Sequence, residues 1–204
     1  MAKKVNRSSN VVSFNESKDG FLLFGRAEFF KWLFQSEFSR QITRVQQHHT
    51  YRPNYAHWND KPDQFHWCKS MKRSHLKRGF SDIGQHITTF PDGSICICRD
   101  FNKTGAGIKG KNARSIVIEH LGDFDIGQDD ITSEHFKTAL FVTAALCIRF
   151  DIEVNEDTIL YHTWFASYKS CPGTNFFGGN TKEDAKNNFY PQIEAMIETL
   201  EDAR

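Results

Sequence analysis

The sequence lacks an excess of charge of either sign. Its 26 lysines and arginines are matched by 25 aspartates and glutamates, which leaves a formal charge of +1 with the nine histidines neutral. Proteins whose main target is a polyanion usually carry a concentrated positive charge. The balance therefore argues against nucleic acid as the main partner.

Long hydrophobic runs are also lacking. The longest apolar stretch, residues 140–150, is about half as long as a membrane span and contains Arg149. We therefore predict a core helix there and no membrane insertion. The first 20 residues contain no apolar run of the kind that a secretory signal requires. We expect synthesis in the cytoplasm without a signal peptide.

Cysteine is sparse, and compact metal motifs are missing. The five cysteines are odd in number and too scattered for the disulfide framework of a small secreted domain. Neither a Cys-x2-Cys pair nor a His-Glu-x-x-His motif occurs. We therefore expect a reducing compartment and free thiols.

Aromatic residues, in contrast, are abundant. The chain contains 19 Phe, 5 Tyr and 4 Trp, and 39% of its 204 residues are hydrophobic, which is enough to bury a substantial core. We predict one globular domain over residues 21–204. Residues 1–20 are polar and are expected to form a loose tail or an arm on that domain.

Hydrophobic periodicity and turn residues predict helices and strands in alternation. Within residues 26–38, Phe30, Phe34 and Phe38 recur every four positions, which is typical of an amphipathic helix. The Pro-Asp-Gly-Ser segment at 91–94 favours a tight turn between two strands. The other expected elements are helices over 63–77, 132–150 and 181–200, strands over 42–50, 83–90, 94–99 and 113–121, and a Gly-rich loop over 105–112.

Three separate segments carry residues that could bind a metal. His48 ends an expected strand, His162 follows an apolar run, and Cys171 precedes Pro172 and Gly173. Two imidazoles and a thiolate suit a catalytic Zn²⁺, which leaves its fourth position to water. Spacing alone is a modest indication, and histidines without a metal remain the larger alternative.

Five motifs in a fixed order give the sequence a specific resemblance. They are residues 48–50 (His-His-Thr), 78–86 (Arg-Gly-Phe-Ser-Asp-Ile-Gly-Gln-His), 91–93 (Pro-Asp-Gly), 115–119 (Ser-Ile-Val-Ile-Glu), and His162 followed by Cys-Pro-Gly at 171–173. Over roughly residues 40–180 the chain resembles the zinc-dependent N-acetylmuramoyl-L-alanine amidases of the type-2 amidase and peptidoglycan-recognition-protein superfamily. The run 171–180 looks most like amidases of Firmicutes and their phages. The resemblance implies an α/β fold, with a central mixed β-sheet flanked by helices and a zinc cleft at one side.

The resemblance also implies the metal ligands. They would be His48, His162 and Cys171, holding Zn²⁺. His49 is then not a ligand, because alternation along a strand turns it to the opposite face. His162 and Cys171 are nine positions apart, which suggests a longer connecting loop than is common in the family.

The implied catalytic pair is Glu119 and Lys169. Many relatives carry a tyrosine directly after the Asp-Ile-Gly motif, where this chain has Gln85. Glu119 resembles the catalytic glutamate of cytoplasmic anhydromuropeptide amidases, and Lys169 matches a catalytic lysine before the third ligand. The resemblance implies that zinc-activated water cleaves the amide between the lactyl group of N-acetylmuramic acid and L-alanine. Glu119 would be general base and acid, and Lys169 would stabilise the oxyanion.

The resemblance also implies substrate contacts, at positions that match groove residues of the family. The candidates for the groove are His75, Arg99 and Asn112. The Gly-rich loop has Gly107 where relatives usually carry a histidine, so that contact is absent or supplied elsewhere. Trp58 and Trp164 could stack on sugar rings or pack in the core.

Two alternatives stand beside a peptidoglycan hydrolase. Loss of the tyrosine, which is replaced here by Gln85, often accompanies relatives that bind muropeptides without cutting them. Zinc could also serve the fold alone. The expected partner is peptidoglycan or a muropeptide, and the protein is expected to be a monomer. It could be a phage endolysin that reaches the cell wall through a holin lesion, a host autolysin, or a recycling enzyme that stays inside the cell.

Overall fold

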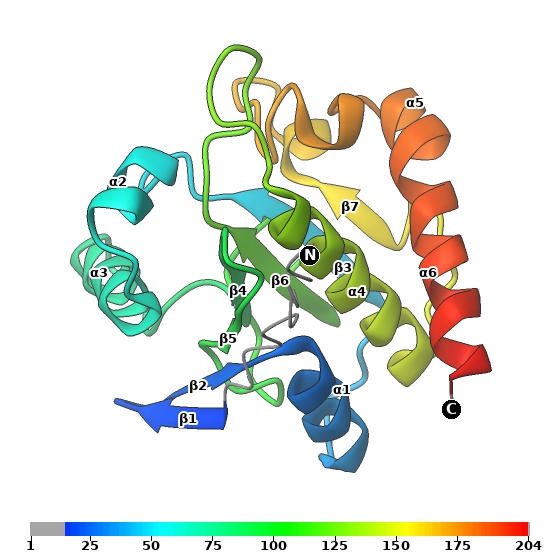
Figure 1. The fold of residues 1–204 in the computed structure, drawn as a ribbon, viewed down its shortest axis with the longest axis horizontal. Coiled ribbons are helices and arrows are strands. Elements are labelled where there is room, and N and C mark those ends of the chain that lie inside the picture. The colour runs from blue at the N-terminus through cyan, green and yellow to red at the C-terminus, as the bar shows by residue number, and fades with distance from the viewer. Residues whose placement is uncertain (1–14, 204) are drawn as a thin grey trace, which may run out of the picture.

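A single mixed sheet organises the chain. The computed structural model of the protein describes residues 15–203, so most of the expected polar tail, residues 1–14, lies outside the described residues. The sheet has seven strands in the order β1-β2-β5-β4-β6-β3-β7 (Figure 1). The strands are β1 (Asn15–Lys18), β2 (Phe21–Phe24), β3 (Arg44–His49), β4 (Ile87–Thr89), β5 (Ile95–Ile97), β6 (Ser115–His120) and β7 (Ile159–Tyr161).

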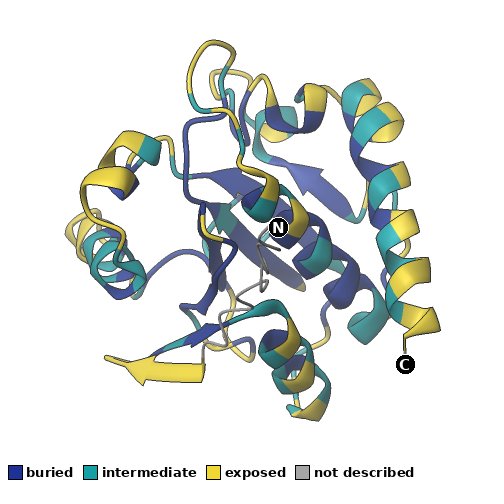
Figure 2. Ribbon diagram, viewed as in Figure 1, coloured by how far each residue is buried: buried dark blue, intermediate teal, exposed yellow. Residues whose placement is uncertain are grey.

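Strand direction divides the sheet into two halves. β4, β6, β3 and β7 pair in parallel, whereas β1, β2, β5 and β4 pair antiparallel. The parallel half is the buried centre of the molecule, and β1 at the far edge is exposed (Figure 2). Burial on both faces is what the β-branched sequence of residues 115–118 requires.

Helices cover both faces of the sheet (Figure 1). α1, α4 and α6 enclose the larger core, which includes Phe29, Val142 and Ile193. α2 and α3 enclose a smaller core that includes Trp58 and Phe65. No helix of the described residues has the length and apolar character to cross a membrane. The α-helices are α1 (Arg26–Gln35), α2 (Tyr55–Asp60), α3 (Gln64–Lys77), α4 (Ser133–Phe150), α5 (Lys182–Asp184) and α6 (Tyr190–Asp202).

Alternation along the central strands sorts their polar residues between the two faces. In β3, Gln47 bonds to Thr143 of α4, whereas Gln46 and His48 lie on the opposite face and contact each other. His48 pairs with Glu119 of the parallel neighbour β6. Paired residues of parallel strands share a face, so His48 and Glu119 lie together on the face that α4 does not cover.

A chain of hydrogen bonds crosses the buried centre on the α4 side. Tyr55 contacts Nδ1 of His135 at 2.8 Å, and Nε2 of His135 contacts Thr89 at 2.7 Å. Thr89 contacts Nδ1 of His120 at 2.7 Å, and Nε2 of His120 contacts Gln47 at 2.8 Å. Both imidazoles of this hydrogen-bond network, those of His120 and His135, have partners on both nitrogens. These bonds satisfy polar groups that would otherwise destabilise the core.

The predicted fold class is confirmed, and several boundaries are corrected. Residues 15–18, for which a loose tail or an arm on the domain was expected, form an edge strand that pairs with β2. The helix expected over 26–38 ends at Gln35, because Ser36 adopts an extended conformation. The hairpin strands are shorter than predicted, and α2, β2 and β7 were not predicted. The helices expected over 63–77, 132–150 and 181–200 are present, the last one interrupted by a π-helical turn at Ala185–Phe189.

Candidate active site

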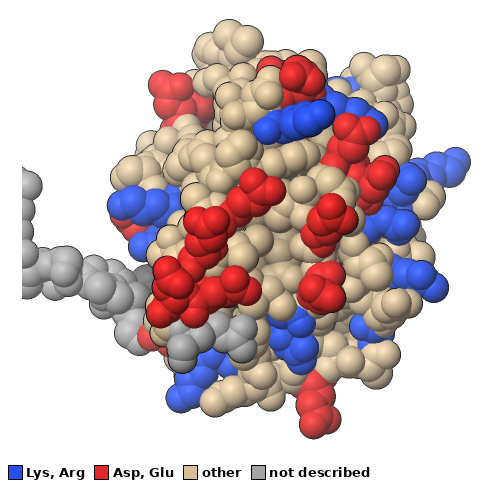
Figure 3. Space-filling model, turned by 90° about the vertical axis from the view of Figure 1, so that its right-hand side faces the viewer, with Lys and Arg blue, Asp and Glu red and all other residues tan. Residues whose placement is uncertain are grey.

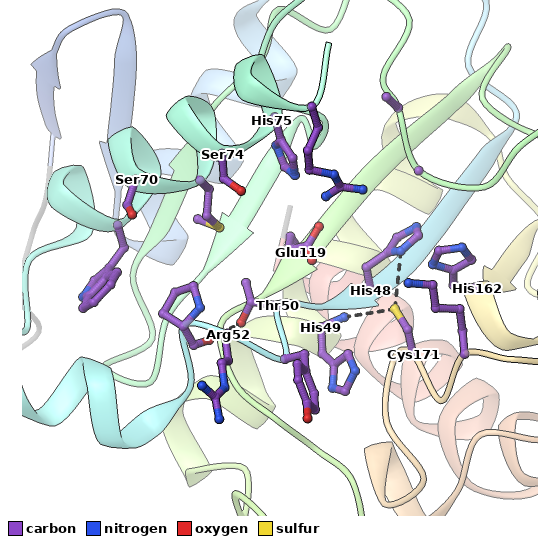
Figure 4. A pocket seen from close by; sticks show the side chains of 18 of the residues that line it. His48, His49, Thr50, Arg52, Ser70, Ser74, His75, Glu119, His162 and Cys171 are labelled. Carbon is purple, nitrogen blue, oxygen red and sulfur yellow. Dashed lines mark hydrogen bonds between the residues drawn. The ribbon is translucent and has the colours of Figure 1, made fainter. Parts of the chain in front are cut away.

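The structure brings His48, His162 and Cys171 together. One potential ligand atom from each residue lies within 4.8 Å of the others. His48 lies near the carboxyl end of β3, and His162 directly follows the parallel neighbour β7. Because parallel strands end at the same edge of a sheet, two distant segments place their imidazoles side by side. Figure 4 shows the three side chains converging.

The loop that carries Cys171 is fixed on both sides. The Thr163 N–H donates to the Cys171 carbonyl at 2.8 Å, and the Asn180 side chain donates to the Ser170 carbonyl at 2.6 Å. The Ser170 hydroxyl donates in turn to Asp125 at 2.8 Å. These bonds hold the thiol against β3 although the loop has no regular structure.

The donor set fits a zinc ion. Sγ of Cys171 lies 3.4 Å from Nδ1 of His48. Zn–S and Zn–N bonds of about 2.3 and 2.0 Å at a tetrahedral angle would separate those atoms by about 3.5 Å. His162 supplies a second imidazole, at a ring-centroid distance of 4.8 Å from His48. Two nitrogen donors and one sulfur donor leave one tetrahedral position open.

Burial and neighbouring charge suit the imidazoles for this role. Burial lowers the pKa of His48 well below its usual value, with the neighbouring His162 acting in the same direction. Burial and Lys169 lower the pKa of His162. Both rings are therefore neutral near pH 7, as metal ligands must be. Burial and Glu119 raise the pKa of Cys171 well above its usual value, so a thiolate at this position needs a cation beside it.

Two groups from β3 contact the ligand side chains directly. The carboxamide oxygen of Gln46 lies 3.2 Å from Nε2 of His48, which leaves Nδ1 facing Cys171. The backbone N–H of His49 donates to Sγ of Cys171 at 3.4 Å. The His49 imidazole is turned away and accepts from the Phe124 N–H at 3.1 Å, as the alternation of the strand predicts.

The Gly-rich loop packs on Gln46, and at Gly107 it presents no side chain to the cleft. The Ile108 N–H donates to the Gln46 carboxamide oxygen at 2.8 Å, and the Gln46 amide donates to the Lys111 carbonyl at 3.0 Å. A Cβ at Gly107 would lie 2.3 Å from the Gln46 oxygen and 2.8 Å from Nε2 of His48. Glycine at this position is therefore required by the close approach of the loop to the ligand.

Glu119 faces the same cleft from β6 (Figure 4). Burial raises the pKa of its carboxyl group to about 8, and the neighbouring Cys98 acts in the same direction. Arg78 and Lys169 oppose that shift. A carboxyl group with a pKa near neutrality both accepts and releases a proton readily.

Lys169 also lines the cleft, beside Ser170 and Cys171. Its ammonium group lies 5.5 Å from the centre of the Tyr168 ring, and its charge lowers the pKa of both His48 and His162. The structure thus places the two proposed catalytic residues and the three proposed ligands around one cleft.

The cleft has a volume of about 740 Å³. Of the three substrate candidates, only His75 lines it, stacked on Phe80. Arg99 instead donates to the Ile83 carbonyl, and Asn112 accepts from the Gly107 N–H. These two contacts belong to the scaffold, so neither residue is among those that line the cleft.

Other residues line the cleft that the sequence did not single out. Arg78 opens the 78–86 motif, and Arg52 lies two residues after the His-His-Thr segment, so both are close to recognised motifs. Trp67 and the highly exposed Tyr168 supply aromatic surface. No periodicity or motif marked these two rings.

The two tryptophans considered for sugar stacking serve the core instead. Trp58 is 6% exposed and its ring lies 5.3 Å from that of Phe90. Trp164 stacks on Tyr161 at 4.8 Å and donates to the Asn180 carbonyl.

Gln85 is buried beneath α3 and is not among the cleft residues. Its amide donates to Thr88 at 3.1 Å and contacts the Met71 sulfur at 3.4 Å. The side chain that stands in the tyrosine position of the family therefore presents no hydroxyl to the cleft.

The surface over α6 carries charges of both signs. Acidic side chains gather in the middle of this face, and basic ones lie mainly along its margins (Figure 3). The described part of this face thus offers no broad basic patch, in keeping with the balanced charge of the sequence.

Fold and site together define an α/β protein of the amidase and peptidoglycan-recognition-protein type, with a His-His-Cys cluster in its cleft. A family model described as N-acetylmuramoyl-L-alanine amidase matches residues 38–174, and the chain belongs to this family. No curated protein matches the chain.

Solved structures share the fold. The N-acetylmuramoyl-L-alanine amidase LysC from Clostridium intestinale URNW has 22% identity and a TM-score of 0.58, covering 78% of this chain and 87% of that one. Drosophila PGRP-LB has 25% identity and a TM-score of 0.58, covering 77% and 85%. A mutant of PGRP-LB in complex with tracheal cytotoxin has 24% identity and a TM-score of 0.58, covering 76% and 86%.

Proposed function

We propose that the protein is a peptidoglycan hydrolase that cleaves the amide between the lactyl group of N-acetylmuramic acid and L-alanine of the stem peptide. The observation that carries this proposal is the clustering of His48, His162 and Cys171 in the cleft that Glu119 and Lys169 also line. Membership of the amidase family supports the same reaction class.

His48, His162 and Cys171 would hold Zn²⁺, which supplies a Lewis acid for the scissile carbonyl and for water. Glu119 accepts the proton of the attacking water and delivers it to the nitrogen of the leaving alanine. Burial raises the pKa of this carboxyl to about 8, and a Zn²⁺ held beside it would lower the pKa again, toward the range where a carboxylate accepts and returns a proton. The carboxylate also orients the water, because it lies on the same sheet face as His48.

Lys169 supplies a positive charge at the cleft wall. The carbonyl oxygen of the substrate gains negative charge as the tetrahedral intermediate forms, and an ammonium group near it lowers the barrier. The bonds that hold residues 170 and 171 restrict the backbone next to this lysine, so little reorganisation is needed.

A muropeptide fits the chemistry of the cleft. Trp67 and Tyr168 offer faces for sugar rings, and Arg52 and Arg78 offer positive charge for peptide carboxylates. The PGRP-LB complex with tracheal cytotoxin shows a ligand on a protein of the same fold, which supports this choice. Action on the cell wall after release from the cytoplasm, as for an endolysin, remains part of the proposal, as does a monomeric state.

Digestion of purified sacculi tests the reaction. With Zn²⁺, the protein should release peptides with new alanine amino termini and produce no new reducing sugar ends. The same assay after chelation should show no release. New reducing ends would instead identify a glycosidase and refute the amidase assignment.

Gln85 favours one alternative, a module that binds muropeptides without cutting them. Its burial against Met71 and Thr88 leaves the cleft without the hydroxyl that many relatives place there. In that case the zinc-loaded protein would co-sediment with sacculi and release no alanine amino termini.

A further inference from the structure

Three cysteines outside the cleft form a second cluster of potential metal ligands. The sulfur atoms of Cys68 on α3 and of Cys96 and Cys98 at β5 lie within 4.8 Å of one another. The sulfurs of Cys68 and Cys98 are 3.5 Å apart. All three cysteines are free and at most 5% exposed, so no disulfide accounts for their proximity.

The cysteine triad is separate from the site in the cleft. Cys96 pairs with Thr88 of β4, and Thr88 pairs with Glu119 of β6. The triad therefore lies beneath α3, with β4 between it and Glu119. None of its three residues lines the cleft.

Buried polar groups next to the triad favour a thiolate there. The Gln85 amide donates to Thr88 Oγ1, and the same oxygen lies 3.2 Å from Sγ of Cys98, where the Thr88 hydroxyl can donate to a thiolate. A hydrogen bond donated to sulfur stabilises its charged form. The carboxamide oxygen of Gln85 is buried and has no hydrogen-bond partner among the described residues. The surroundings of Cys98 are therefore not those of a purely apolar core.

We propose that Cys68, Cys96 and Cys98 bind a thiophilic metal ion of the zinc class. Zn–S bonds of about 2.3 Å at a tetrahedral angle would separate two sulfur ligands by about 3.8 Å, and the sulfurs of Cys68 and Cys98 already lie near that separation. Binding of a divalent ion replaces three S–H bonds by three S–metal bonds, releases three protons to solvent, and leaves one net negative charge.

Such an ion would connect a wall of the cleft to the sheet. α3 carries Cys68 and also presents Ser70, Ser74 and His75 to the cleft (Figure 4). β5 carries Cys96, and Cys98 directly follows this strand. The ion would therefore fix the position of α3 without touching substrate, and this role does not depend on the proposed hydrolase function.

Metal content of the full-length protein provides the test. After expression in zinc-supplemented medium, elemental analysis and native mass spectrometry should find two zinc ions per wild-type chain. Cys68→Ser should retain one, and so should the double variant His48→Ala/Cys171→Ser. The control Cys147→Ser, which changes a buried cysteine of α4 outside both clusters, should retain two. One zinc in the wild type, retained by Cys68→Ser and lost from the double variant, would overturn the proposal.

Cobalt provides a second measurement in case Cys68→Ser fails to fold. The double variant His48→Ala/Cys171→Ser keeps the triad intact, so Co²⁺ added during refolding should give a strong sulfur-to-metal charge-transfer band in the near ultraviolet. No band, or a Cys68–Cys98 disulfide found by thiol counting in denaturant, would refute the site. Neither result depends on hydrolytic activity, so failure here is distinguishable from failure of the proposed function.

Discussion

The carboxamide oxygen of Gln46 lies 3.2 Å from Nε2 of His48, two residues further along the same strand. The same oxygen accepts the Ile108 N–H, and the Gln46 amide donates to the Lys111 carbonyl. The glutamine is thus held at both ends. It fixes the imidazole so that Nδ1 faces Cys171.

We predict that Gln46→Leu lowers zinc affinity about 10- to 100-fold, because loss of a partner that orients a metal-binding histidine has effects of this size. Competition with a chromophoric chelator measures the affinity. Gln47→Leu is the matched control, since Gln47 faces α4 and bonds to Thr143 and His120. It should reduce stability and leave zinc affinity unchanged. Equal affinities for Gln46→Leu and the wild type would contradict the positioning role.

Gly107→Ala should disturb the contact between Gln46 and His48 from the side of the Gly-rich loop. Its Cβ would lie within 2.3 Å of the Gln46 oxygen and 2.8 Å of Nε2 of His48, so the loop or the ligand must move. We expect a loss of about 1–3 kcal/mol in unfolding free energy, typical of overpacking, together with weaker zinc binding. Gly110→Ala, in the same loop but with nothing within 4 Å, should lose stability through its positive φ while keeping its zinc affinity.

These contacts also show what the sequence could not reveal. The strand with His48 and the strand with Glu119 were recognised from β-branched runs and motifs, and parallel pairing brought both residues to one face. Asn112 and Arg99 were assigned to substrate by position alone. Their actual partners are backbone groups of the Gly-rich loop and of residue 83, which become neighbours only in the folded chain.

The edge of the sheet shows a second reason why part of the fold could not be predicted from the sequence. Residues 15–18 are polar and exposed, so composition indicated a loose tail or an arm, and no strand. Their backbone nevertheless pairs with β2, whose Phe21 and Leu23 are buried under α3 in the smaller core. Strand pairing uses backbone groups that every sequence possesses, and polar edge strands therefore leave little trace in hydrophobic patterning.

Replacement of the cleft carboxylate tests the proposed chemistry. Glu119→Gln should retain zinc and bind sacculi, but lose alanine release by about 100-fold or more, because the amide cannot take up and return a proton. Glu198→Gln, an exposed position on α6, serves as the matched control and should keep full activity. Unchanged turnover in Glu119→Gln would remove this residue from the mechanism.

Stability should fall on acidification because His86 is buried as a neutral ring. Its Nδ1 accepts the Val117 N–H at 2.9 Å, and its Nε2 donates to the Lys103 carbonyl at 2.9 Å. Burial lowers the pKa of His86 from 6.5 to about 3. Between about pH 6.5 and pH 3 the unfolded chain therefore binds a proton at His86 that the native state does not bind. The stability that neutral His86 contributes is complete above about pH 6.5 and is lost as the pH falls toward about 3.

Urea unfolding with chelator present, at about pH 7.5 and pH 5, measures this effect. His86→Gln removes the titrating ring, so the variant should be less stable than the wild type at the higher pH and lose less stability on acidification. An equal loss in both proteins would assign the pH dependence to other groups.

Removal of zinc from the cleft should abolish hydrolytic activity and leave the protein folded. The two hydrophobic cores enclose the sheet from both faces, and His48, His162 and Cys171 belong to neither. A ligand at a hundredfold excess over its Kd stabilises by about 3 kcal/mol, which for a chain of this size corresponds to a Tm change of about 6–12 °C. We therefore expect mild chelation to abolish alanine release, to lower Tm by that amount, and to leave the far-ultraviolet circular dichroism unchanged at 25 °C.

Collapse of the circular dichroism spectrum on chelation would instead show that metal in this site serves the fold. Repeating the measurement with Cys68→Ser separates this contribution from that of an ion in the cysteine triad.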